Sequence, residues 1–124
     1  MKPLSDCTVL ILEKDFGVGL QLMRALSDEG CRGVKLVRTV EGALRELAAA
    51  TPDVATLDLD VRGKPSTVVA DVLAAHDVPF VVISSRSIGV PGANHRRFAV
   101  CQKPVAIPAV VSLLTSAITQ RKAA

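Results

Sequence analysis

The stretch Asp53-Val54-Ala55-Thr56-Leu57-Asp58-Leu59-Asp60 decides the fold of this chain. Its centre, residues 54–57, is a short run of apolar and β-branched side chains that follows the breaker Thr51-Pro52. Such a run, bounded by polar residues, is typical of a strand that is buried on both faces of a sheet. Asp58 then lies at the rim of the sheet, where a partly desolvated carboxylate can act as a nucleophile. The alternative is an ordinary solvated loop acid.

The same kind of run recurs along the whole chain. Short apolar runs predict five strands, over residues 8–12, 33–38, 54–58, 79–84 and 98–102. Amphipathic segments predict helices over residues 16–29, from Thr39 onward, over 66–76 and over 106–121, with a loop over 61–66. Gly89, Pro91 and Gly92 predict that any helix over 86–96 is short or absent. Strands that alternate with helices predict an α/β fold: a flavodoxin-like, five-stranded parallel sheet of order 2-1-3-4-5 with helices on both faces.

Size and composition narrow the classes of function. The 124 residues fit one domain, 1–124, and the low aromatic content of 2% predicts an aliphatic core. The net charge of +3 is scattered, without the basic stripe and stacking aromatics of a nucleic-acid-binding protein. The three cysteines follow no metal-ligand spacing. Because neither a signal peptide nor a membrane-spanning apolar run occurs, we expect a cytoplasmic protein that binds no nucleic acid and no membrane.

Four polar side chains stand where predicted strands end. The carboxyl ends of parallel strands meet at one edge of the sheet, so we expect Glu13, Asp58, Ser84 and Lys103 to lie together. A lysine at the end of an apolar strand is costly to desolvate unless an anion faces it, and Pro104 restrains its backbone. The Ser84 hydroxyl either hydrogen-bonds a phosphoryl oxygen or is an ordinary loop serine. Acid, hydroxyl and ammonium together suit an aspartate that accepts a phosphoryl group.

A metal site at this edge would need oxygen ligands, which hard cations such as Mg²⁺ prefer. The candidates are Glu13, Asp58 and the backbone carbonyl of Asp60, while Asp15 is either a further ligand or the N-cap of the next helix. Lys14 stands where a second carboxylate is expected. Its charge would repel a divalent ion by about 4 kcal/mol per unit charge at roughly 4 Å and an effective dielectric constant near ~20. Alternatively, Lys14 pairs with Asp58 and mimics the metal.

In this order and spacing, the residues resemble the receiver domain of bacterial two-component response regulators over essentially the whole chain. The resemblance rests on Val9-Leu10-Ile11-Leu12-Glu13, on Pro52-Asp53 through Leu57-Asp58, on Pro79-Phe80-Val81-Val82-Ile83-Ser84 and on Lys103-Pro104.

This resemblance implies a function for each matched position. Asp58 corresponds to the aspartate that takes a phosphoryl group from a histidine kinase or phosphotransfer protein, and Ser84 and Lys103 to its partners in the site. The implied cofactor is Mg²⁺, with Lys14 as the residue that argues against it. The resemblance further implies a stand-alone signalling protein and no enzyme, which contacts an unidentified output protein and can pair as a homodimer.

Three departures from the family pattern leave a second interpretation open. Lys14 replaces the acid that usually ligates Mg²⁺ directly, Val100 occupies the position of a common aromatic switch residue, and residues 89–92 erode the fourth helix. The alternative is therefore a non-phosphorylatable pseudo-receiver that acts as a constitutive protein-binding module. A small α/β enzyme or nucleotide binder is disfavoured, because the chain has no phosphate-cradling glycine loop.

Overall fold

The computed structural model of this chain describes residues 2–61, 64–85 and 98–123. Its main sheet consists of five parallel strands in the spatial order β2-β1-β3-β6-β7. The strands are β1 (Thr8–Leu12), β2 (Gly33–Val37), β3 (Val54–Asp58), β6 (Phe80–Ser84) and β7 (Phe98–Gln102). Numbered among themselves, these strands have the order 2-1-3-4-5, so the predicted flavodoxin-like sheet is confirmed.

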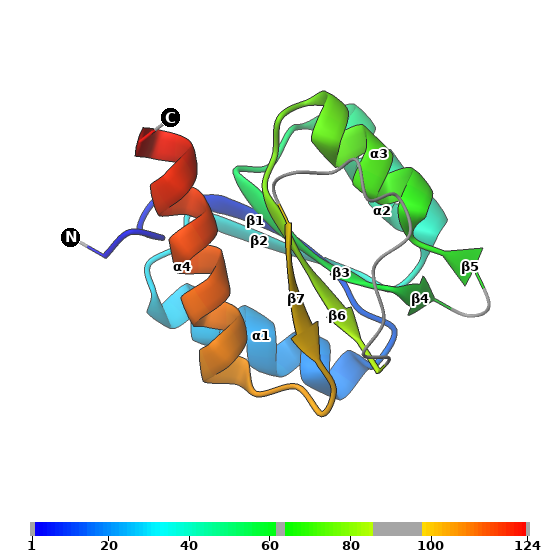
Figure 1. Ribbon diagram of the computed structural model, residues 1–124, viewed down its shortest axis with the longest axis horizontal. Helices are drawn as coiled ribbons and strands as arrows, with labels where there is room; N and C mark the ends of the chain where they lie inside the picture. The colour runs from blue at the N-terminus through cyan, green and yellow to red at the C-terminus, as the bar shows by residue number, and fades with distance from the viewer. Residues whose placement is uncertain (1, 62–63, 86–97, 124) are drawn as a thin grey trace.

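The helices of the described residues cover both faces of this sheet. They are α1 (Phe16–Asp28), α2 (Val40–Ala49), α3 (Thr67–Ala75) and α4 (Ile107–Ala123). Figure 1 shows α1 and α4 on one face and α2 and α3 on the other. Helix α1 begins after Asp15, whose side chain accepts a hydrogen bond from the Val18 N–H, so the capping alternative for Asp15 is confirmed.

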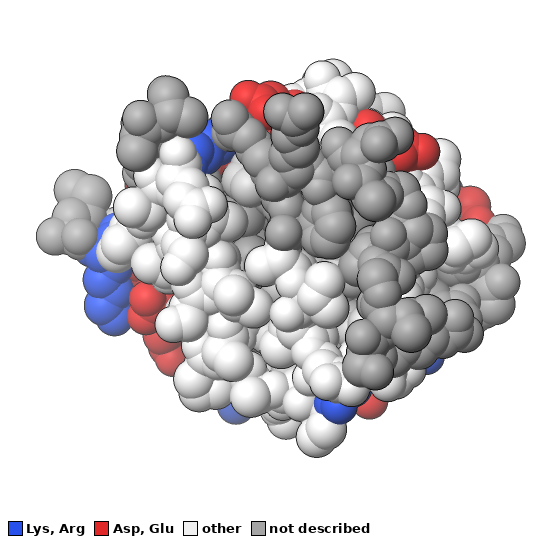
Figure 2. All heavy atoms as spheres, viewed as in Figure 1, with Lys and Arg blue, Asp and Glu red and all other residues white. Residues whose placement is uncertain are grey.

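Figure 2 shows that the surface over α4 and β7 is largely uncharged.

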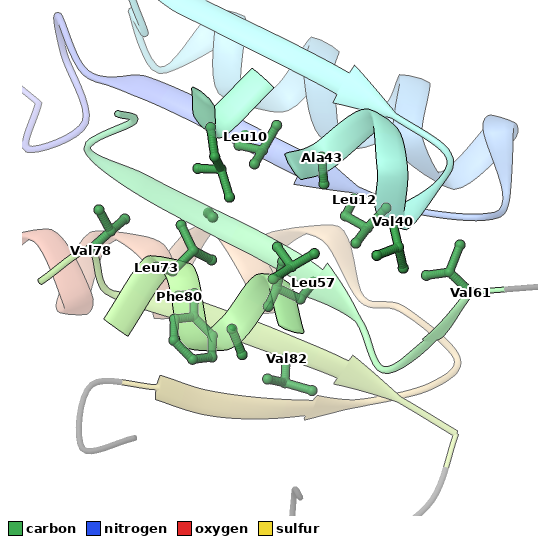
Figure 3. Close-up of a cluster of buried hydrophobic side chains, with 14 residues drawn as sticks. Leu10, Leu12, Val40, Ala43, Leu57, Val61, Leu73, Val78, Phe80 and Val82 are labelled. Carbon is green, nitrogen blue, oxygen red and sulfur yellow. The ribbon is translucent and has the colours of Figure 1, made fainter. Parts of the chain in front are cut away.

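Side chains alternate along each strand between two hydrophobic clusters. Leu10, Leu12 and Leu57 belong to the cluster between the sheet and helices α2 and α3 (Figure 3). Ile11 and Val54 belong to the other cluster, which α1 and α4 cover. Because the side-chain period of a strand is two residues, this phase continues past the strand ends. Glu13 stands two residues after Ile11, and Thr56 and Asp58 stand two and four residues after Val54. Their side chains therefore face the side of the sheet that α1 and α4 cover.

One part of the predicted element pattern is wrong. A loop was expected over residues 61–66, but Val61 belongs to β4 (Asp60–Val61), and this strand pairs antiparallel with β5 (Lys64–Pro65). Val61 is buried and joins the cluster under α2 and α3. Two-residue strands are too short to produce a readable alternation, and the glycine and proline here favour a loop in any sequence-based reading. The prediction that any helix over residues 86–96 is short or absent falls outside the described residues.

Within the described parts of the chain, none of the helices combines the length and the apolar character needed to cross a bilayer.

Candidate functional site

Asp58 and Lys103 meet at the carboxyl edge of the sheet. Asp58 ends β3, and Lys103 directly follows β7. The Nζ atom of Lys103 lies 3.2 Å from each of the two carboxylate oxygens of Asp58. The Asp58 side chain is 3% exposed and the Lys103 side chain 23% exposed. The contact expected from the sequence is therefore present, and it joins a nearly buried carboxylate to an ammonium that still reaches solvent.

Ser84 lies at the end of the strand between these two groups. It closes β6, which pairs with β3 on one side and β7 on the other. Its carbonyl oxygen accepts a hydrogen bond of 2.7 Å from the Lys103 N–H, and its side chain is buried. This hydrogen bond ties the backbone of Lys103 to the end of β6. A hydrogen bond from the Ser84 hydroxyl to a phosphoryl oxygen stays a prediction.

Glu13 is fully buried beside Asp58. The register of β1 on β3 pairs Ile11 with Thr56, and two further residues along each strand bring Glu13 next to Asp58. Its Oε2 atom accepts a hydrogen bond of 3.0 Å from the Asp15 N–H, whereas Oε1 is buried and has no hydrogen-bond partner in the described parts of the chain. When Glu13 is ionised, one of its two carboxylate oxygens is therefore buried without a hydrogen bond from the described residues.

The surroundings of Glu13 change its acidity. The pKa of its carboxyl is raised from 4.5 to about 7, first by burial and then by a hydrogen bond with the Asp58 side chain and by the charge of Asp58. The Asp15 N–H and the Lys103 ammonium act against this by favouring the ionised form. When protonated, Glu13 can donate the hydrogen bond that its Oε1 lacks.

Lys14 contacts Asp58 through its backbone and not through its ammonium. The Lys14 N–H lies 3.4 Å from Asp58 Oδ2, and the Lys14 side chain is exposed. Among the described residues, Asp58 is paired with Lys103, so the alternative in which Lys14 pairs with Asp58 is wrong. Arg38 holds this turn in place: its Nη2 donates a hydrogen bond of 3.3 Å to the Lys14 carbonyl, and its guanidinium lies 5.5 Å from the centroid of the Phe16 ring.

The predicted magnesium ligands are not gathered into one acidic cluster. The described residues contain no group of three or more His, Cys, Asp or Glu side chains that could hold a metal ion. Asp15 uses its Oδ1 to cap α1, and Asp60 begins the hairpin, where it pairs with Pro65. A role for the Asp60 carbonyl stays a prediction. With Lys14 in place of an acid, the donor set does not fit a magnesium ion.

Arg38 is the member of this edge that the sequence reasoning missed. It directly follows β2, as Glu13 follows β1 and Lys103 follows β7. The rule that found the other residues, a polar side chain at the end of an apolar strand, applies equally here. The sequence pattern placed Arg38 inside the predicted strand over residues 33–38, whereas β2 ends at Val37, and this hid the position of Arg38 at the rim.

Comparison with known proteins gives two different results. No family model matches the sequence, and no curated protein matches it. Solved structures do match the fold over nearly the whole chain. The solution structure of SdrG from Sphingomonas melonis Fr1 is 32% identical, covers 96% of this chain and 99% of its own, and has a TM-score of 0.71.

Two further structures are similar at lower identity. A response regulator receiver protein from Sinorhizobium medicae WSM419 is 21% identical, with a TM-score of 0.81, and the match covers 95% of this chain and 98% of that one. A CheY-like response regulator receiver domain from Methylobacillus flagellatus is 20% identical, with a TM-score of 0.75 and coverage of 91% and 99%. Both matches span nearly the full length of the two chains, so these structures share the fold of this chain.

Proposed function

Since this chain belongs to the receiver domains of response regulators, we propose that Asp58 accepts a phosphoryl group from a histidine kinase or phosphotransfer protein. In this proposal the chain is a signalling component that works through protein contact, and it is not an enzyme acting on a diffusing substrate. Lys103 and Ser84 are the partners of Asp58 in the same site.

The observation that carries this proposal is the pairing of Asp58 with Lys103. The Asp58 side chain is only 3% exposed. Burying a carboxylate costs free energy of desolvation unless a charge or hydrogen bonds compensate for it. Here one ammonium at 3.2 Å from both oxygens compensates for it, together with a long contact to the Lys14 N–H. Asp58 therefore keeps oxygen lone pairs available for attack, and Lys103 is already in position to neutralise the negative charge of a transferring group.

The transfer step follows from this geometry. One Asp58 oxygen attacks the phosphorus of a phosphohistidine, and a P–O bond forms while the P–N bond breaks. The electron pair of the broken bond remains on the imidazole of the donor. We propose that the Ser84 hydroxyl then turns towards the new phosphoryl group and that this movement alters the surface formed by β6 and β7.

The surface for an output protein, or for a second copy of the chain, would be the one formed by α4 and β7. That surface is largely uncharged (Figure 2), and Val100 on β7 is 44% exposed. An uncharged surface with an exposed aliphatic side chain suits protein contact better than contact with a polyanion.

A constitutive pseudo-receiver is the second candidate, and Val100 favours it. A valine has no aromatic ring that could swing between an exposed and a buried position, so a β7 surface built around Val100 can stay the same with or without phosphorylation. In that case the α4 and β7 surface would bind its partner equally well in both states.

The experiment that tests the proposal measures covalent phosphorylation. The protein is incubated with acetyl phosphate, and its intact mass is recorded over time. We expect the gain of one phosphoryl group in the wild-type protein and no gain in Asp58→Asn. The matched control is Asp53→Asn at the other end of β3, which should gain the group as the wild type does. Absence of any gain in folded wild-type protein would favour the pseudo-receiver.

A further inference from the structure

The carboxyl edge of the sheet gathers cations where a metal-dependent acceptor site would gather acids. The carboxylate of Asp58 has the buried Glu13 beside it, and Asp15 uses its Oδ1 atom as a helix cap. The same edge carries Lys103, Lys14 and Arg38.

One of these residues contacts Asp58 through its charged group, one contacts it through its backbone, and the third contacts the adjoining turn. Lys103 touches both oxygens of Asp58 at 3.2 Å. Lys14 is fixed through its N–H, 3.4 Å from Asp58 Oδ2, while its exposed ammonium sits on a flexible four-carbon stem. Arg38 donates to the Lys14 carbonyl at 3.3 Å, so its guanidinium adjoins the same turn.

We propose that this site accepts its phosphoryl group without a divalent metal ion, with the ammonium groups of Lys103 and Lys14 supplying the positive charge and Arg38 positioning Lys14. The proposal rests on the function proposed above and concerns the cofactor requirement of the same site. A phosphoryl group on Asp58 would carry its oxygens out towards solvent, where the Lys14 stem can swing over them. Fixed positive charge at developing negative charge is the main source of stabilisation in phosphoryl transfer.

The chemical step balances without a metal. With acetyl phosphate as the donor, an Asp58 oxygen attacks phosphorus, the new P–O bond forms, and the P–O bond to the acetyl group breaks. The electron pair leaves with acetate, and no proton or electron is required from another reactant. The lysine ammonium groups reduce the electrostatic repulsion between the incoming phosphate dianion and the negatively charged Asp58 carboxylate.

The test compares phosphorylation by acetyl phosphate in excess EDTA with phosphorylation in excess Mg²⁺, read by intact mass. We expect wild-type initial rates that agree within about twofold. Lys14→Asp restores an acid beside Glu13, so its rate in EDTA should fall by about tenfold or more, and Mg²⁺ should recover it. The control Arg24→Glu makes the same kind of charge reversal on the exposed side of α1 and should behave as the wild type.

A second readout does not depend on phosphorylation. In a calorimetric titration with Mg²⁺ alone, we expect no saturable binding to the wild type and saturable binding to Lys14→Asp. Saturable binding to the wild type that Asp58→Asn abolishes would overturn the proposal.

The two proposals fail in different ways. If the wild type is phosphorylated only with Mg²⁺, the metal-free site is refuted and Asp58 remains a phosphoryl acceptor. If folded wild-type protein gains no phosphoryl group under either condition, the acceptor function itself is refuted, and the metal-free mechanism with it.

Discussion

Asp53 directly precedes strand β3 and Asp58 is its last residue, and the two carboxylates have opposite surroundings. Asp53, at the start, is 40% exposed, and its Oδ2 accepts hydrogen bonds from the Thr8 N–H at 2.8 Å and the Thr8 hydroxyl at 3.2 Å. Asp58, at the end, is 3% exposed and is held mainly by Lys103. A similar acid–base pair occurs at both ends, because Arg121 lies 3.9 Å from Asp53 Oδ1.

The comparison separates a structural acid from a reactive one. The Asp53 carboxylate is partly exposed to solvent and accepts hydrogen bonds from Thr8 at the start of β1. It therefore links β1 to the start of β3. The Asp58 carboxylate is nearly buried and is held mainly by one ammonium group, which leaves oxygen lone pairs free to react. Active sites tend to collect groups whose arrangement is poor for stability and good for chemistry.

The largest expected difference between the two ends concerns their basic partners. Lys103→Met should slow phosphorylation by acetyl phosphate about 100-fold, because the charge that faces the transferring group is lost. Arg121→Met should leave that rate unchanged within about twofold and lower the free energy of unfolding by about 1 kcal/mol, since it loses a 2.8 Å hydrogen bond to the Asp53 carbonyl. Intact-mass time courses and urea unfolding measure the two effects. Equal rate losses in both variants would erase the proposed distinction.

The second prediction concerns pH, and it belongs to the Asp58 end alone. The pKa of Glu13 is raised from 4.5 to about 7 in the folded protein, mainly by burial. Between these values the unfolded chain has released the proton while the folded chain keeps it, so the free energy of unfolding falls as pH rises through this window. Stability from this group is fully present below pH 4.5 and is lost as pH passes the folded pKa.

Urea unfolding of wild type and Glu13→Gln at pH 5 and pH 7.5 tests this dependence. Glutamine cannot ionise, so the variant should show a smaller loss of stability between the two pH values than the wild type does. The same pH dependence in both proteins would mean that another group causes it.

The third prediction compares how replacing each aspartate by asparagine changes the free energy of unfolding. Asp53→Asn should lower the free energy of unfolding by about 1 kcal/mol, because the hydrogen bonds from Thr8 to the charged carboxylate are weakened. Asp58→Asn should leave the free energy unchanged or raise it, because two buried carboxyls no longer face each other. Urea unfolding at pH 7.5 compares them, and a greater loss in Asp58→Asn than in Asp53→Asn would contradict the assignment of structural and reactive roles.

The smallest effects are expected at two threonines. The Thr8 hydroxyl donates to Asp53 Oδ2 and accepts from the Asp53 N–H, each at 3.2 Å, whereas the Thr56 hydroxyl is buried and has no hydrogen-bond partner among the described residues. Thr56→Val should therefore raise the free energy of unfolding by about 1 kcal/mol, and Thr8→Val should lower it by a similar amount. Thermal unfolding suffices for this pair. A destabilised Thr56→Val protein would indicate that its hydroxyl has a partner after all.

Much of the reactive end could be predicted from the sequence, because its residues follow directly from strand ends. The apolar runs before Glu13, Asp58, Ser84 and Lys103 mark strands, and parallel strands bring those ends to one edge. What the sequence could not give was the direction of individual side chains. Lys14 neighbours the site in sequence, yet its backbone and not its ammonium contacts Asp58.

Other features were hidden for different physical reasons. The contact of Arg121 with Asp53 joins residues 68 positions apart and depends on how α4 crosses the sheet, which no local pattern specifies. Leu4 is fully buried although it precedes the first strand, because its side chain packs into the cluster that α1 and α4 cover. The hairpin of β4 and β5 is too short to leave a periodic signal.

The central claim, that Asp58 is the residue that takes the phosphoryl group, is tested most directly by locating the modification. The protein is treated with acetyl phosphate and reduced with borohydride, which converts an acyl phosphate to the corresponding alcohol, and its peptides are then sequenced by mass spectrometry. The account predicts homoserine at position 58 and unmodified aspartate at position 53. Homoserine at Asp53, or the reduced alcohol of any acidic residue other than Asp58, would contradict it.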